Sequence, residues 1–208
     1  MKILNIIIIL FFLSGCTREK EVKFEEGLNY FDDTFIDHFP VKIKHIGSVQ
    51  AVSQNISNAH PHVWLKYYPG KIRLDSIESS AELRAIGKYS SDDTCLIVID
   101  KHLTSKNWYK IDKKIRNPKL IEYGDLDCHK GKFPVPNFYG EWWAETEKTL
   151  TKLEGYTMYV LEAKKGIHMD PKKLPNGLYT PLGWEHGISK GIAINKKTGA
   201  VIYWADIW

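Results

Sequence analysis

The chain has 208 residues and a formal net charge of +4 at pH 7. That length suits one domain with a sizeable core. Because both charge signs are mixed along the chain without a basic block, we expect no nucleic-acid partner. The sequence contains 8 Phe, 11 Tyr and 7 Trp, a composition that favours a β-rich fold and a binding face.

The amino-terminal segment has the organisation of a secretory signal. An apolar run over residues 3–13 follows Met1 and Lys2 and leads into Leu13-Ser14-Gly15-Cys16. One positive charge, an apolar core and small residues before a cleavage site make a signal peptide over residues 1–15. The run is too short for the ~20 residues that span a bilayer.

Leu13-Ser14-Gly15-Cys16 resembles the lipobox of bacterial lipoproteins. The resemblance implies cleavage before Cys16 and acylation of Cys16, so that lipid rather than a transmembrane helix anchors the chain. Thr17, not aspartate, follows this cysteine. By the same resemblance, the usual inner-membrane retention signal is missing. We therefore expect an outer-membrane location, on its periplasmic or surface face.

Residues 16–27 are mostly charged and show no apolar face. They predict a lipidated cysteine followed by a flexible tether. The globular domain is expected over residues 28–208.

Within this domain the first elements are short. Asp33 and Thr34 predict the cap of a short helix that Pro40 ends. Residues 63–68 alternate loosely between turn signals and predict a strand. Ser79 and Glu82 have the spacing of a capping box, which predicts a helix over residues 79–89.

Later segments are more apolar. The β-branched run over residues 94–99 predicts a central, doubly buried strand. Residues 117–140 read mostly as loop, residues 141–153 as a helix and residues 156–161 as a strand.

The carboxyl-terminal pattern is the clearest. Residues 188–194 and 200–208 flank a turn that Gly199 ends, which predicts a β-hairpin. Both faces of its last strand are largely apolar, so this strand is expected inside the sheet. The order of elements predicts a single α+β domain, with an antiparallel or mixed β-sheet, two or three helices and a carboxyl-terminal β-hairpin.

Cys95 and Cys128 remain after the lipidated cysteine. An even pair in an oxidising compartment predicts a disulfide. The alternative is a buried free thiol at Cys95, which lies in an apolar run.

Gly187-Ile188-Ser189-Lys190-Gly191, preceded by His186, matches the G-x-S-x-G pattern of a nucleophile elbow. That motif requires a strand before the serine, a helix after it and a later histidine. Here a strand follows, and no histidine lies downstream. Ser189 and His186 are therefore weak catalytic candidates, and the alternative is that the glycines relieve the backbone where the strand begins.

Metal-capable side chains gather at residues 125–131, but Lys130 and Pro136 occupy positions where a calcium loop needs glycine and glutamate. A zinc site at Cys128 and His129 would need distant ligands and a reduced thiol. His60 and His62 lack a visible third ligand. We predict no metal and no other cofactor.

Trp142, Trp143 and Trp184 are candidate binding residues. Adjacent tryptophans cannot both face one core, and Trp184 lies in a loop among glycines. With no convincing catalytic constellation, these features predict a lipid-anchored binding or interaction module of the cell envelope, held by its membrane anchor and binding an envelope protein or a glycan. The alternatives are a glycan-binding lipoprotein and a small serine hydrolase.

Overall fold

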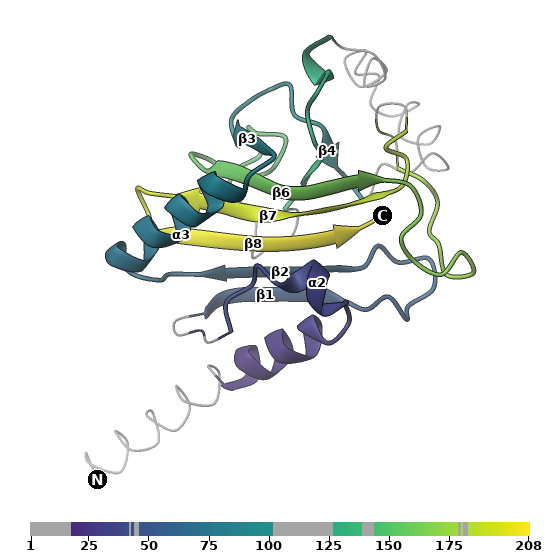
Figure 1. Cartoon of the computed structure of the whole chain (residues 1–208), viewed down its shortest axis with the longest axis horizontal. Coiled ribbons are helices and arrows are strands. Elements are labelled where there is room, and N and C mark those ends of the chain that lie inside the picture. Colours follow the sequence, from purple (N-terminus) through teal and green to yellow (C-terminus); the bar gives the residue numbers. More distant parts are fainter. Residues whose placement is uncertain are drawn as a thin grey trace.

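A computed structural model describes residues 18–41, 43, 46–101, 127–138, 144–178, 180 and 183–208. Its centre is a six-stranded antiparallel sheet with the strand order β1-β2-β8-β7-β6-β3 (Figure 1). These strands are β1 (Ile46–Val52), β2 (His62–Tyr67), β3 (Gly87–Ser90), β6 (Thr157–Lys165), β7 (Gly187–Asn195) and β8 (Ala200–Ile207).

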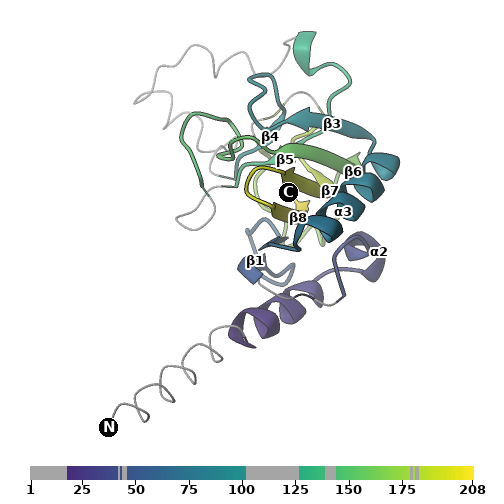
Figure 2. The same ribbon diagram turned by 90° about the vertical axis from the view of Figure 1, so that its left-hand side faces the viewer.

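Different structures cover the two faces of this sheet (Figure 2). A helix over residues 18–28, α2 (Asp33–Ile36) and α3 (Lys71–Arg84) pack against one face. The segments that carry β4 (Val98–Ile99) and β5 (Val135–Pro136) cover the other, with the 3-10 turn η1 (Asp127–His129) nearby. β4 and β5 pair in parallel as a separate two-stranded sheet. Among the helices in the described ranges, none combines the length and apolarity needed to cross a membrane.

The sheet divides the interior into two main apolar clusters, which strand alternation explains. In β8, Val201, Tyr203 and Ala205 enter the helix-side cluster, whereas Ile202 and Trp204 enter the opposite one. Every residue of β7 and β8 is buried. The α+β fold, the carboxyl-terminal hairpin and the interior position of its last strand are therefore confirmed.

Three other predicted elements are found close to their expected places. They are α2, β2 and β6. α2 begins one residue after its N-cap Asp32, and the Asp32 side chain makes no capping hydrogen bond.

The helix predicted over residues 79–89 is wrong in its bounds. Ser79 lies inside α3, and its hydroxyl donates to the Asp75 carbonyl at 3.0 Å instead of capping a terminus. Leu83 is 89% exposed, while Leu74 and Ala81 are the buried residues of α3. The end of the predicted segment forms β3, because pairing with β6 supplies its backbone partners.

The strand predicted at residues 94–99 is not central in the main sheet. Only Val98–Ile99 is a strand, and it lies in the smaller sheet. The apolar run from Leu96 to Ile99 is buried nevertheless, since it fills space beneath the main sheet. Residues 144–153 form turns and no helix, and the rest of the helix predicted at 141–153 lies outside the described residues.

The flexible tether predicted before residue 28 is also not what the structure shows over residues 18–27, which are helical. Phe24 is 5% exposed and belongs to the helix-side core, with Leu28 packed against that core. Positions four apart share one side of a helix, so two apolar residues among charges suffice to dock it. The Lys20 ammonium also donates to the Gly47 carbonyl of β1 at 2.8 Å.

Candidate functional site

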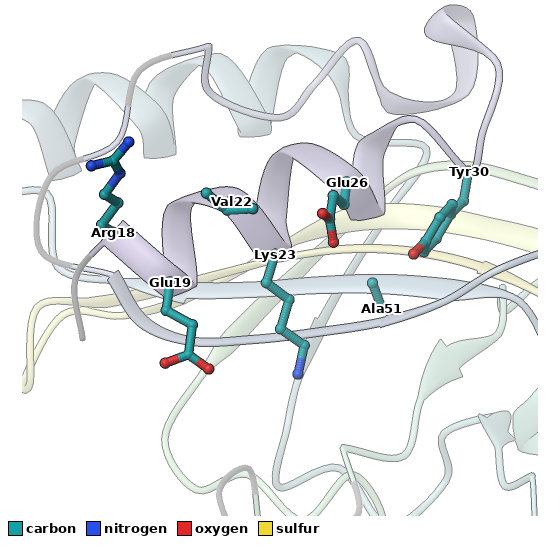
Figure 3. A pocket seen from close by; sticks show the side chains of 7 residues that line it. All are labelled: Arg18, Glu19, Val22, Lys23, Glu26, Tyr30 and Ala51. Atoms are coloured by element: carbon teal, nitrogen blue, oxygen red, sulfur yellow. The ribbon is translucent and has the colours of Figure 1, made fainter. Parts of the chain in front are cut away.

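An open groove lies between the amino-terminal helix and strand β1, with a volume of about 550 Å³. Figure 3 shows that its walls come mainly from the helix and the turn after it, with Ala51 contributed by β1. The helix approaches β1 closely, because a Cβ atom placed on Gly27 would lie 2.7 Å from the Ala51 Cβ. The lining residues are Arg18, Glu19, Val22, Lys23, Glu26, Tyr30 and Ala51.

The groove offers both apolar and charged contacts. Val22 is 45% exposed and Tyr30 is 36% exposed, although both are large apolar side chains. The other lining side chains of the helix are two cations and two carboxylates. Such a mixed wall suits a polypeptide better than a purely apolar ligand.

Strand β1 borders this groove and is an edge of the sheet. In the part of the chain that the structure describes, its one strand neighbour is β2, and all seven of its residues are partly exposed. A register shift between Ile46 and Ser48 interrupts the pairing at one end, where Lys20 bonds the Gly47 carbonyl. Edge strands present backbone donors and acceptors that an added strand can use.

A cluster of buried ionisable groups lies on the opposite face of the sheet. The Asp206 carboxylate of β8 has no exposed surface and lies 2.6 Å from the Lys101 ammonium. Its second oxygen accepts a hydrogen bond from the Trp64 indole at 2.7 Å. Lys101 lies over the Trp64 ring at 4.5 Å, and the His62 ring contacts the same indole at 4.6 Å between centroids.

Burial shifts the ionisation of these groups toward their neutral forms. It raises the pKa of Asp206 against the opposing effect of Lys101, and it lowers the pKa of Lys101 against the opposing effect of Asp206. Burial, followed by the Lys101 charge, holds the pKa of His62 well below its ordinary value. The charged and neutral forms of the Asp206–Lys101 pair are therefore closer in free energy than in water.

Perturbed ionisable groups are a signature of reactive sites, but this cluster is closed. Asp206 is fully buried, and Trp64 and His62 are 2% and 4% exposed. A substrate would have to displace these side chains to reach the carboxylate. The arrangement instead fastens the segment after β4 to the centre of the sheet.

A second ionic cluster joins α2 to the sheet. Lys190 of β7 is 5% exposed, and its ammonium donates to the Thr34 carbonyl at 2.7 Å and to Asp37 at 3.0 Å. Glu162 lies 3.3 Å from the same ammonium. Lys190 thus donates a hydrogen bond to a backbone carbonyl of α2. These ionic and hydrogen-bond partners explain why a lysine is tolerated in a buried strand.

The G-x-S-x-G segment is a strand, not a nucleophile elbow. Ser189 has no exposed surface; its hydroxyl donates to the Pro134 carbonyl at 2.8 Å and accepts from the Trp204 indole at 3.3 Å. His186 precedes the strand, and no contact joins it to Ser189 among the described interactions. A Cβ atom on Gly187 would lie 2.8 Å from the Trp208 ring, and one on Gly191 would overlap the Trp204 ring. The glycines therefore make room for two indoles.

Trp184, one of the three tryptophans predicted as candidate binding residues, is not an exposed aromatic surface. Its ring is 7% exposed and stacks against Trp208 at 6.2 Å between centroids, with Lys165 over its face at 5.3 Å. Trp142 and Trp143 lie outside the described residues.

Cys95 and Cys128 form a disulfide, as their even number predicts, with Cα atoms 6.1 Å apart. The His129 side chain lies beside this disulfide. His62 is buried in the ionic cluster, and one of its ring nitrogens lies 2.9 Å from the His60 carbonyl.

Sequence reasoning missed Lys101 and Asp206 as a pair. The alternation of β8 places Asp206 on the same face as Ile202 and Trp204, and a carboxylate on an apolar face signals a buried partner. No local pattern identifies Lys101 as that partner. The groove was missed because its helix was predicted to be a tether.

Comparison of the chain with family models, curated proteins and solved structures finds no match.

Proposed function

We propose that the chain is a lipid-anchored module of the bacterial cell envelope that binds a protein partner in the groove between its amino-terminal helix and β1. The observation that carries this proposal is the position of the groove. Arg18 is one of its lining residues, and only Thr17 separates that residue from the lipobox cysteine. Two residues span at most about 7 Å, so lipid on Cys16 would hold the groove against the membrane surface.

The groove and the neighbouring edge suit an extended polypeptide segment. An extended segment can pair with the backbone of an exposed edge strand while its side chains enter adjacent pockets. Val22 and Tyr30 provide apolar contacts, and Arg18 and Glu26 provide charges of both signs. The expected partner is therefore an outer-membrane protein, or another protein close to that membrane, that exposes such a segment.

The positions of the other candidates favour binding over catalysis. Ser189 is buried, and its hydroxyl is engaged by Pro134 and Trp204. The burial of Trp184 removes one of the surfaces on which a glycan would stack. The groove, in contrast, is open and lined by side chains that can contact a partner.

The anchor is tested separately from the groove. Cells that express the chain are grown with labelled palmitate, and Cys16→Ala is the matched variant. Incorporation of label into the wild type, and its loss together with membrane association in Cys16→Ala, supports the anchor. An unlabelled wild type in the membrane-free fraction rejects it.

The groove is tested by site-specific photocrosslinking in intact cells. A photoreactive amino acid replaces Val22 or Tyr30. Leu83 on α3 is the control, because it is 89% exposed and is not one of the residues that line the groove. We expect one protein adduct from the two groove positions, none from Leu83, and loss of the Tyr30 adduct when Val22→Arg fills the groove. Equal adducts from all three positions, or none from the groove of a labelled lipoprotein, would reject groove binding while leaving the anchor intact.

A further inference from the structure

The Cys95–Cys128 disulfide has a buried histidine at its side. His129 is 8% exposed and directly follows Cys128 on the turn η1. One ligand-capable atom from each of Cys95, Cys128 and His129 lies within 4.8 Å of the others. Two sulfurs and an imidazole nitrogen are the ligands that zinc prefers in proteins.

We propose that reduction of this disulfide converts Cys95, Cys128 and His129 into a three-ligand zinc site. The proposal is independent of the groove and adds a redox-dependent activity to it. The oxidised chain would contain the Cys95–Cys128 disulfide, and the reduced chain would bind zinc. These two states exclude each other because the same sulfurs serve both.

The reaction has two steps. A protein dithiol of the thioredoxin class transfers two electrons and two protons to the disulfide, which yields two thiols and leaves the reductant as a disulfide. Zinc then binds the two sulfurs as thiolates with release of two protons, and neutral His129 supplies the third ligand. The fourth position remains for water or an exogenous ligand.

The geometry of the backbone is compatible with both states. The Cα atoms of the cysteines are 6.1 Å apart. Two thiolates on one tetrahedral zinc, at Zn–S distances of ~2.3 Å, lie about 3.8 Å from each other. Rotation of the two side chains supplies this separation. Cys128 is exposed, which gives a reductant access to the disulfide.

An ionic network holds the backbone of Cys95. The Lys132 ammonium donates to the Cys95 carbonyl at 2.8 Å. Asp93 accepts from the Cys95 backbone amide at 2.8 Å and pairs with Lys132 at 2.7 Å. These contacts do not use the sulfurs, so they can hold the Cys95 backbone in place when the disulfide opens.

The test uses the full chain with Cys16→Ser, which leaves only the two relevant cysteines. The protein is reduced with a water-soluble phosphine, and zinc affinity is measured by competition with a chromophoric chelator. Cadmium serves as a spectroscopic substitute, because its thiolate charge-transfer absorption reports sulfur ligation. Near-ultraviolet circular dichroism records whether the reduced protein stays folded.

We expect one equivalent of zinc in the reduced protein, none in the oxidised protein, and a cadmium–thiolate band only after reduction. Cys128→Ser should weaken binding by at least about 100-fold and His129→Ala by at least about 10-fold, since changes outside the ligand set alone cost ~10–100-fold. His168→Ala is the matched control, because its ring is exposed and bonds the local Lys165 carbonyl.

Three results would overturn the proposal. They are the absence of stoichiometric zinc in the reduced protein, an unchanged affinity in His129→Ala, and loss of the folded circular-dichroism signal on reduction that zinc does not restore. The variant Cys95→Ser/Cys128→Ser separates a specific site from weak binding elsewhere, because it keeps all the histidines. Binding that survives in this variant would be a fourth result that rejects the site.

Discussion

The Asp206 carboxylate and the Lys101 ammonium lie 2.6 Å apart at a point in the sheet where the Asp206 side chain has no exposed surface. This pair joins the last strand to the segment after β4, and Trp64 lies against both partners. Burial makes the charged form of each group less favourable, because it raises the pKa of Asp206 and lowers the pKa of Lys101. Each group therefore depends on the other to remain ionised. The relationship makes the pair sensitive to the loss of one partner.

Replacement of Asp206 by asparagine should therefore destabilise the protein by about 3 kcal/mol. This value is at the lower end of the range for breaking a buried pair, because the Lys101 side chain keeps 17% exposure. Asparagine can still accept the Trp64 hydrogen bond, so the loss of unfolding free energy measures the effect of removing the carboxylate charge. Adding Lys101→Met should recover part of the loss, because it removes the unpaired ammonium.

Urea unfolding of the single and double variants measures both effects. Glu82→Gln is the control, because both side chains of its pair with Lys88 are exposed and the pair should contribute little to stability. A loss in Asp206→Asn no larger than that in Glu82→Gln would contradict the role assigned to the buried pair.

His38 should make the fold sensitive to acid. Burial, against a hydrogen bond to the Trp204 carbonyl, lowers the pKa of His38 to about 3. Its unfolded-state pKa is ~6.5, so below that pH the unfolded chain takes up a proton that the native chain does not. Stability should fall as the pH decreases from about 6.5 toward 3, by up to ~1.4 kcal/mol per pH unit from this group.

Unfolding free energies between pH 7 and pH 4 test this expectation. His38→Gln should be less stable at pH 7 but show a shallower dependence on pH. His168→Gln, in an exposed position, should leave the dependence unchanged. The same slope in His38→Gln and the wild type would show that His38 does not carry the effect.

The amino-terminal helix should contribute to stability through Phe24. Phe24→Ala removes an aromatic ring that is 5% exposed in the helix-side core, and such changes cost ~3–5 kcal/mol. Val22→Ala, on the exposed side of the same helix, should change stability by less than about 0.5 kcal/mol. Chemical denaturation compares the two variants. Equal stabilities would restore the interpretation of this segment as a tether.

Much of the sheet could be predicted because its signals are local. The hairpin of β7 and β8 combines a turn ending at Gly199 with two apolar runs. Both faces of β8 are apolar, which predicts that the strand lies inside the sheet, and the structure confirms this position. β2 and β6 are likewise bounded by turn residues. In these segments, alternation and turn chemistry point to the same structure.

Other elements could not be predicted because few residues hold them. The amino-terminal helix docks mainly through Phe24 and Leu28, and α3 buries only Leu74 and Ala81. Such sparse apolar positions give weak periodicity. The apolar run at residues 94–99 predicts that these residues are buried, but it does not predict which segments they pack against. The Lys101–Asp206 pair forms only through tertiary contact, so no local pattern predicts it.

Gly191 should be needed for the packing of Trp204 across β7. The two residues are direct partners in the sheet, and a Cβ atom on Gly191 would overlap the Trp204 ring and the Tyr159 carbonyl. Gly191→Ala should destabilise the protein by about 1–3 kcal/mol through overpacking. Because the clash involves the indole, the loss should be smaller when Trp204→Phe is present, so the two changes should not be additive. A double-mutant cycle by urea unfolding measures the coupling. Full stability of Gly191→Ala, or strict additivity with Trp204→Phe, would mean that the indole does not require this glycine.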